Sequence, residues 1–137
     1  MRTMKASIVL FLVISSMNIS GQNLIGYNER DIRQYMKDKQ KTMSFQNFTN
    51  NSTFKYLKYT DNAETQTLLF FLTEDSICKS IRLVCDKSLK ALKTKEYDAL
   101  YKKSGDNVWT DTKNGEKYII ELKDEDWSIS ITIRLNE

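Results

Sequence analysis

The sequence predicts an α+β protein in which two helices lie on one face of an antiparallel sheet of about six or seven strands. Two segments have the apolar spacing of amphipathic helices, residues 29–40 and the segment that follows Asp86. Several other segments alternate apolar and polar side chains, and the Asn-Gly pair at residues 114–115 is a strong signal for a tight hairpin. The order helix, strands, helix, strands favours antiparallel meanders with both helices on one sheet face.

The first 21 residues have the features of a secretory signal peptide. Arg2 and Lys5 precede an unbroken run of small and apolar residues from 6 to 14. This run is shorter than the roughly 20 apolar residues that a transmembrane helix needs. The segment also contains no cysteine that could carry a lipid. We therefore expect a periplasmic or extracellular protein without a stable membrane anchor, whose single mature domain comprises residues 22–137.

The composition of the mature part argues against several functions. Two of the 21 basic residues lie in the leader, which leaves 19 against 18 acidic residues. This near balance provides no strong field for nucleic acid. The chain has no histidine, which removes serine-histidine and cysteine-histidine catalysis and nearly every catalytic zinc site. A catalytic pair of carboxylates survives this exclusion, but the sequence singles out no catalytic, cofactor-binding or metal-binding residue.

The first helix is predicted over residues 29–40 by agreeing local signals. Asn28 is the expected N-cap, with Asp31 three residues later as a capping-box partner. Tyr27 is expected to pack onto Ile32 as a hydrophobic staple. The apolar stripe of this helix then consists of Ile32, Tyr35, Met36 and Met43.

Alternation of apolar and polar side chains begins at residues 43–48. Three extended segments are predicted after it and before the second helix, and the first comprises residues 54–60. Residues 67–73 are apolar on both faces, so we expect this segment to be the central strand, covered on both sides. In the third, Ile77, Ile81, Leu83 and Cys85 are expected to share one face.

The two cysteines, Cys78 and Cys85, lie seven residues apart in this third segment. A straight strand would place them about 23 Å apart and on opposite faces. A disulfide needs Cα atoms within about 7 Å of each other. We therefore expect two unpaired cysteines, with Cys85 buried as a small apolar side chain.

The second helix is expected to begin at Asp86 or Ser88 as its cap. Lys102 and Lys103 fall in its expected last turn, where the helix dipole favours cations, and Gly105 is the expected left-handed C-cap. The predicted apolar stripe consists of Leu89, Leu92, Tyr97, Leu100 and Tyr101.

The C-terminal third predicts a three-stranded meander. The Asn-Gly turn pairs Trp109 with Ile120 if it is taken literally. A second tight turn at residues 124–125 would pair Leu122 with Trp127 in the core. The last strand then alternates without a fault, with Trp127, Ile129, Ile131, Ile133 and Leu135 facing the core. The opposite, polar face is the candidate partner surface and consists of Ser128, Ser130, Thr132 and Arg134.

The two halves have the pattern of degenerate repeats. Residues 72–75 and 80–83 echo residues 122–125 and 132–135. This exported chain of two helix-then-meander units resembles the layout of the beta-lactamase inhibitor protein. The opening segment 26–36 is similar to the first helix of small outer-membrane assembly lipoproteins, although the lipid-bearing cysteine is missing. Over its mature length the chain resembles small uncharacterised exported bacterial proteins.

Three functional hypotheses remain. The first is an exported non-catalytic binding or interaction module, which uses the polar sheet face or a loop edge to hold a protein, peptide or glycan. The second is a carboxylate-dependent hydrolase acting on glycans, with acids from residues 74–75 or 124–126. Adjacent acids in tight turns are usually turn formers, which favours the first hypothesis. The third is an envelope-assembly component.

Overall fold

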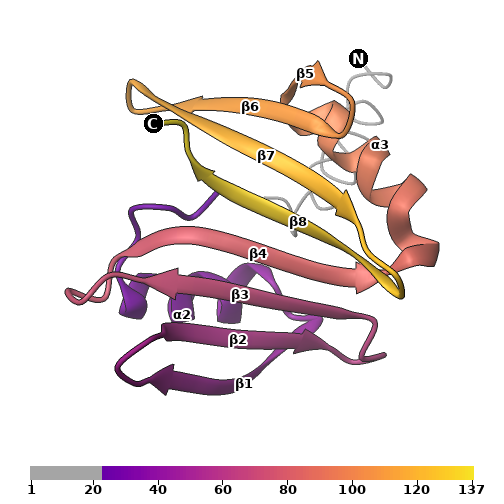
Figure 1. The fold of residues 1–137 in the computed structure, drawn as a ribbon. Helices are drawn as coiled ribbons and strands as arrows, with labels where there is room; N and C mark the ends of the chain where they lie inside the picture. Colours follow the sequence, from indigo (N-terminus) through magenta and orange to yellow (C-terminus); the bar gives the residue numbers. More distant parts are fainter. Residues whose placement is uncertain (1–22) are drawn as a thin grey trace, which may run out of the picture.

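The computed structural model describes residues 23–137, so the predicted signal peptide lies outside the described residues. One antiparallel sheet of eight strands has the order β1-β2-β3-β4-β8-β7-β6-β5. This confirms the α+β class and the antiparallel sheet, with more strands than the six or seven expected (Figure 1). The elements are α2 (Glu29–Lys39), β1 (Met43–Asn50), β2 (Lys55–Asp61), β3 (Gln66–Leu72), β4 (Cys78–Asp86), η1 (Lys87–Leu89), α3 (Lys90–Leu100), β5 (Lys102–Gly105), β6 (Val108–Lys113), β7 (Glu116–Asp124) and β8 (Ser128–Leu135).

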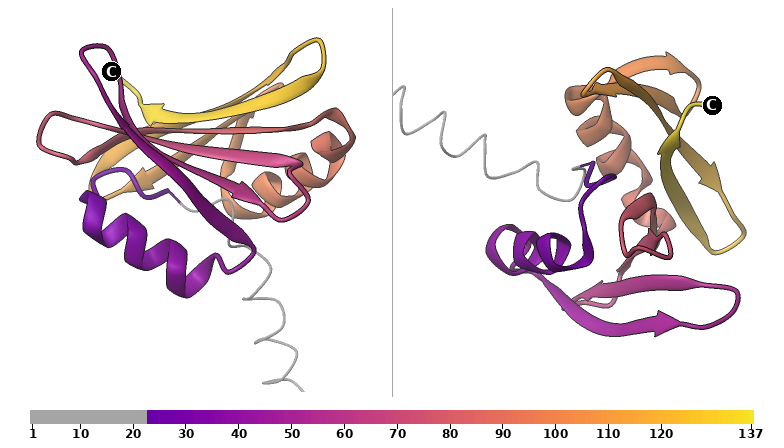
Figure 2. Two further views of the ribbon diagram at one scale, coloured as in Figure 1. Left: turned by 90° about the horizontal axis from the view of Figure 1, so that it is seen from below. Right: turned by 90° about the vertical axis from the view of Figure 1, so that its left-hand side faces the viewer.

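Two units of one helix and four strands meet in the middle of this sheet. The first unit is α2 with β1 to β4, and the second is α3 with β5 to β8. They join where β4 pairs with β8, for example at Leu83 opposite Ile131. Figures 1 and 2 show a strongly twisted sheet with both helices on one side. The other side is an open face that no helix of the described residues covers.

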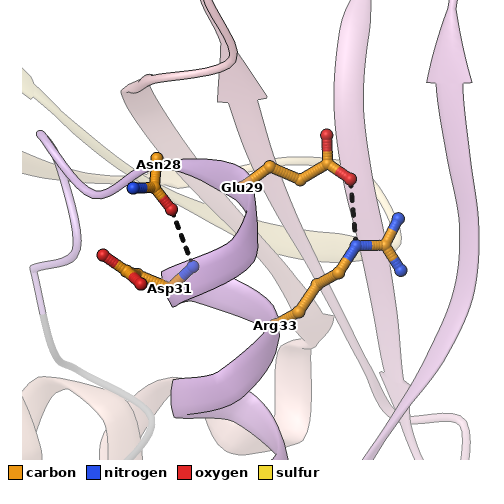
Figure 3. Close-up of polar contacts among 4 residues, drawn as sticks. All are labelled: Asn28, Glu29, Asp31 and Arg33. Atoms are coloured by element: carbon orange, nitrogen blue, oxygen red, sulfur yellow. Dashed lines mark hydrogen bonds and ion pairs between the residues drawn. The ribbon is translucent and has the colours of Figure 1, made fainter.

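Helix α2 forms as its local signals predict. The Oδ1 atom of Asn28 accepts a hydrogen bond from the Asp31 backbone N–H at 2.8 Å (Figure 3). This cap satisfies one of the donors that every helix N-terminus leaves free. The helix ends at Lys39, one residue before the predicted end, and buries Ile32 and Met36 against the sheet.

The core lies between the helices and the sheet and includes a cluster of aromatic side chains in the second unit. Trp109 is fully buried, and its ring lies edge-on to that of Tyr97 with the centroids 5.6 Å apart. The indole N–H of Trp109 donates to the Asp98 carboxylate at 2.8 Å, so the buried polar atom is satisfied. The predicted pairing of Trp109 with Ile120 is confirmed.

The prediction that residues 67–73 form the central strand is wrong. The two middle strands are β4 and β8, and β3 lies one position further out. Its side chains alternate, with Leu68 and Phe70 buried while Leu69 and Phe71 are only partly covered. The partly covered apolar side chains lie on the open face and contact neighbours within the sheet, such as Tyr56 beside Phe71. No second layer of described residues covers them.

A β-bulge in β4 overturns the predicted placement of Cys78. Phe71 is opposite Ser80 and Leu72 is opposite Cys78, so β4 contains one extra residue at this point. The extra residue turns Cys78 onto the same buried face as Cys85. Both cysteines are free, as predicted, and each is 2% exposed. Burial raises the pKa of the Cys78 thiol to about 12 and that of Cys85 to about 11.

The second helix differs from the prediction at both ends. It follows the short 3-10 turn η1, and Asp86 makes no capping side-chain hydrogen bond. After Leu100 the chain becomes extended at Tyr101, and residues 102–105 form β5. The predicted lysine-rich last turn and the Gly105 cap are therefore wrong.

The predicted apolar stripe of this helix is misplaced at Leu92 alone, since Tyr97 is buried and the other three members, Leu89, Leu100 and Tyr101, pack against the core. Lys93, four residues before Tyr97, is buried, whereas Leu92 is 53% exposed. At 3.6 residues per turn, residues four apart share a face and residues five apart do not. Burial of Tyr97 therefore brings Lys93 inward and leaves Leu92 outside.

The last hairpin has a register four residues away from the predicted one. Leu122 is opposite Ile131, and the turn is closed by the Glu125 N–H, which donates to the Ser128 carbonyl at 2.9 Å. A shift by an even number leaves each strand residue on its predicted face. Trp127, however, falls in the turn and is 91% exposed, so its predicted place in the core is wrong.

Candidate functional site

The open face of the sheet brings together polar side chains from the adjacent strands β4, β8 and β7. Thr132 on β8 lies opposite Arg82 on β4 and opposite Glu121 on β7. Ser130 is likewise opposite Lys123 on β7. Because directly opposite residues of a sheet share a face, these side chains form rows across the open face.

A groove of about 470 Å³ runs over these rows. Of the predicted partner surface, Ser130, Thr132 and Arg134 line the groove, whereas Ser128 lies outside it, opposite Asp86. Ser130 is almost fully buried at the groove floor. The full lining consists of Arg82, Glu121, Lys123, Asp124, Glu125, Ser130, Thr132 and Arg134.

The charges of the groove are only partly neutralised within the chain. Arg82 donates to the Glu125 carboxylate at 3.3 Å, and Lys90 of α3 forms an ion pair with Asp124 at the groove end. In the described part of the chain, Arg134 has no ion-pair partner, and its side chain is exposed. A guanidinium in this position is available for a carboxylate supplied from outside.

Among the acidic residues considered for a glycan hydrolase, Asp124 has a pKa shifted in the direction opposite to the one that a general acid requires. The hydrogen bond from Lys90 lowers the pKa of Asp124. A general acid needs a carboxyl whose pKa is raised. Glu74 and Asp75 are exposed in the β3–β4 turn. Among the residues 23–137, no group of three or more histidines, cysteines or acids is arranged to hold a metal ion.

Trp127 lies at the tip of the β7–β8 hairpin, two residues beyond Glu125 at the end of the groove. Its 91% exposure contrasts with the complete burial of Trp109. Tryptophan is enriched among the residues that dominate the binding energy of protein interfaces. Its exposure is not predictable from alternation, because a tight turn at residues 124–125 would have placed it in the strand.

No family model, curated protein or solved structure matches this chain. Within the described residues, no helix combines the length and apolar character that a membrane span requires. The residues of the groove and the hairpin tip therefore provide the basis for a functional proposal.

Proposed function

We propose that this protein is an exported, non-catalytic binding module that holds a protein or peptide partner on its open sheet face. The observation that carries the proposal is the 91% exposure of Trp127 at the hairpin tip, two residues along the chain from the groove residue Glu125. Tryptophan is among the residues that most often dominate the binding energy of protein interfaces, because it buries a large apolar area with little loss of conformational freedom. Trp127 is the proposed anchor of the partner.

The arginines of the groove support a partner segment that carries carboxylates. Arg82 lies opposite Thr132, and Arg134 lies two residues further along β8, so the two arginines are diagonal neighbours on one face. Their planar guanidinium groups suit carboxylates, which they bind through paired hydrogen bonds. The expected partner therefore presents acidic side chains to the groove and an apolar pocket to Trp127.

The test is capture of the partner from the envelope of the source cell by the purified protein. Trp127→Ala and Arg134→Ala should each abolish or strongly reduce capture, because they remove the proposed anchor and a proposed carboxylate-binding group. Both side chains are exposed outside the core, so both variants should still fold. Two matched controls should capture normally: Phe54→Ala, which removes an aromatic side chain 52% exposed in another turn, and Arg30→Ala, which removes an arginine 88% exposed on α2.

The outcomes separate the competing functions. Equal capture by Trp127→Ala and the wild type would refute the proposed anchor. Capture of an acidic glycan with no protein would favour a glycan-binding module, and sedimentation with lipid in the absence of protein would favour an envelope-assembly component. Loss of capture at high salt would support the role of the arginines, because salt screens exposed charges.

Export belongs to the same proposal and has its own test. The charged start and short apolar run of the leader predict removal of about 21 residues. Mass spectrometry of the protein recovered outside the cytoplasm should find an N-terminus near residue 22. Recovery of mainly intact Met1 in that fraction would contradict export by cleavage.

A further inference from the structure

The two outer edges of the sheet differ in how well they are protected from other strands. β5 has four residues, carries Lys102 and Lys103, and contains a register shift before Gly105. β1 has eight residues, none of them charged, and no described residue pairs with its outer side (Figure 1). Free N–H and C=O groups along such an edge are a template for pairing with another strand. Charged side chains and short edge strands normally prevent this pairing.

The backbone of β1 presents these groups at defined residues. The Asn51 N–H donates to the Phe54 carbonyl at 2.8 Å, which makes this a hydrogen-bonded pair. Hydrogen-bonded and non-hydrogen-bonded pairs alternate along an antiparallel ladder. Phe48, opposite Leu57, is therefore in a non-hydrogen-bonded pair, and its N–H and C=O turn toward the free side.

A bulge at Gln46 gives Phe45 the same orientation as Phe48. Phe45 is opposite Tyr59, which lies two residues from Leu57 on β2, so both pairs have the same phase. Residues three apart in a regular strand would point to opposite faces, but the extra residue brings both phenylalanines onto the helix-covered face. Phe45 is 43% exposed and Phe48 is 37% exposed, because both lie at the outer margin of this face.

We infer that β1 pairs in antiparallel fashion with β1 of a second copy of this chain, with Phe45 of each copy opposite Phe48 of the other. The two-fold axis passes between Gln46 and Asn47. The arrangement is self-complementary, because Phe45 and Phe48 both offer outward hydrogen-bonding groups and lie on one face. An uncharged strand also meets its own copy without the like-charge repulsion that keeps most identical edges apart.

A groove beside Phe45 supports this register. It has a volume of about 330 Å³ and its lining includes Met43, Tyr59 and Arg33, whose guanidinium lies 4.4 Å from the centroid of the Phe45 ring. Phe48 of the second copy would enter this groove next to Phe45. Aromatic side chains in opposite positions are among the more stabilising cross-strand pairs.

Sedimentation velocity over a range of concentrations tests the pairing in the purified protein. The wild type should show a concentration-dependent monomer–dimer equilibrium. Phe48→Lys places a charge at the seam and removes the ring, and should raise the dimer Kd at least about tenfold. Phe54→Lys makes the same change at a residue 52% exposed just beyond β1, and should leave the Kd unchanged. Circular dichroism checks that both variants fold.

A spin label attached to an introduced cysteine locates the interface without altering the phenylalanines. The two native cysteines are each 2% exposed and should not react, so in Gln46→Cys the label should attach only to the new thiol, which lies beside the expected axis. Strong dipolar broadening should appear there and not in Asp106→Cys at the opposite edge of the sheet. A monomer at every concentration would overturn the inference. A dimer with broadening only in Asp106→Cys, or one unaffected by Phe48→Lys, would also overturn it.

Discussion

The two units of the molecule have the same layout, but different interactions define their helices. Helix α2 starts with a side-chain cap at Asn28 and has acidic residues in its first turn and lysines in its last. Helix α3 has no side-chain cap at its start, and Tyr101 leaves it in an extended conformation. Its position is set by Tyr97, which packs on Trp109. Local sequence signals thus define the first helix, whereas tertiary burial defines the second.

The largest effect that tests this comparison is expected at the two tryptophans. Trp109→Ala removes a fully buried ring and its hydrogen bond to Asp98, so it should lower the free energy of unfolding by about 3 to 5 kcal/mol. Trp127→Ala removes a ring that is 91% exposed and should change it by no more than about 0.5 kcal/mol. Urea unfolding followed by circular dichroism measures both. A larger loss at Trp127 than at Trp109 would contradict the register of the last hairpin.

The helix starts provide the next test. Asn28→Ala removes the acceptor of the Asp31 N–H and should cost about 1 kcal/mol of unfolding free energy. Asp86→Ala at the start of the second helical segment removes no capping hydrogen bond and should stay within about 0.5 kcal/mol of the wild type. Equal losses in thermal or urea unfolding would show that both helices depend on their caps alike.

The features that could be predicted from the sequence are those that depend on neighbours in the chain. The Asn28 cap and the Asn-Gly hairpin need only a few consecutive residues, and both are confirmed. Alternation also gives the correct faces of Ile129 and Ile131. It does not define register, because a shift by two or four residues preserves every face. The predicted tight turn at residues 124–125 and the observed turn between Glu125 and Ser128 are therefore equally compatible with the alternation. The predicted turn placed Trp127 in the strand, which is wrong.

The remaining errors depend on contacts between distant segments. The bulge that turns Cys78 inward appears only when β4 is paired with β3. Three residues of the predicted polar face, Ser130, Thr132 and Arg134, line the groove and lie on one strand. Arg82 joins them only through the pairing of β4 with β8. Its position between buried Ile81 and Leu83 was the available signal that it faces away from the core.

A smaller effect is expected at the turn between β2 and β3, where Asp61 titrates. Burial alone would raise its pKa, but hydrogen bonds from Thr65 and Gln66 outweigh this and lower it. The carboxylate therefore stabilises the fold above its unfolded pKa of about 3.9, and this stability is lost as the pH falls through the lower folded value. Asp61→Asn should flatten the acid limb of stability against pH. An unchanged acid limb in urea titrations between about pH 2 and 5 would contradict this role.

The smallest effect is expected at the ion pair that flanks the α2 cap. The Arg33 Nε donates to the Glu29 carboxylate at 3.0 Å, one helical turn away (Figure 3). Such i,i+4 pairs contribute about 0.3 to 0.5 kcal/mol and weaken with salt, so Glu29→Gln should lose about this much at low salt and less at high salt. Arg33→Ala should cost more, because its guanidinium also lies over Phe45 of β1.

The neighbouring Arg30 provides the control for this ion pair. It approaches only Asp31, at 3.8 Å, with a side chain that is 88% exposed. Exposed pairs at such a distance contribute little, so Arg30→Ala should leave the urea midpoint unchanged. If Arg30→Ala and Arg33→Ala were equally mild, the contact of Arg33 with β1 would add nothing to stability. Helix α2 would then be fixed to its strands by apolar packing alone, whereas α3 is also held by the hydrogen bond between Asp98 and Trp109.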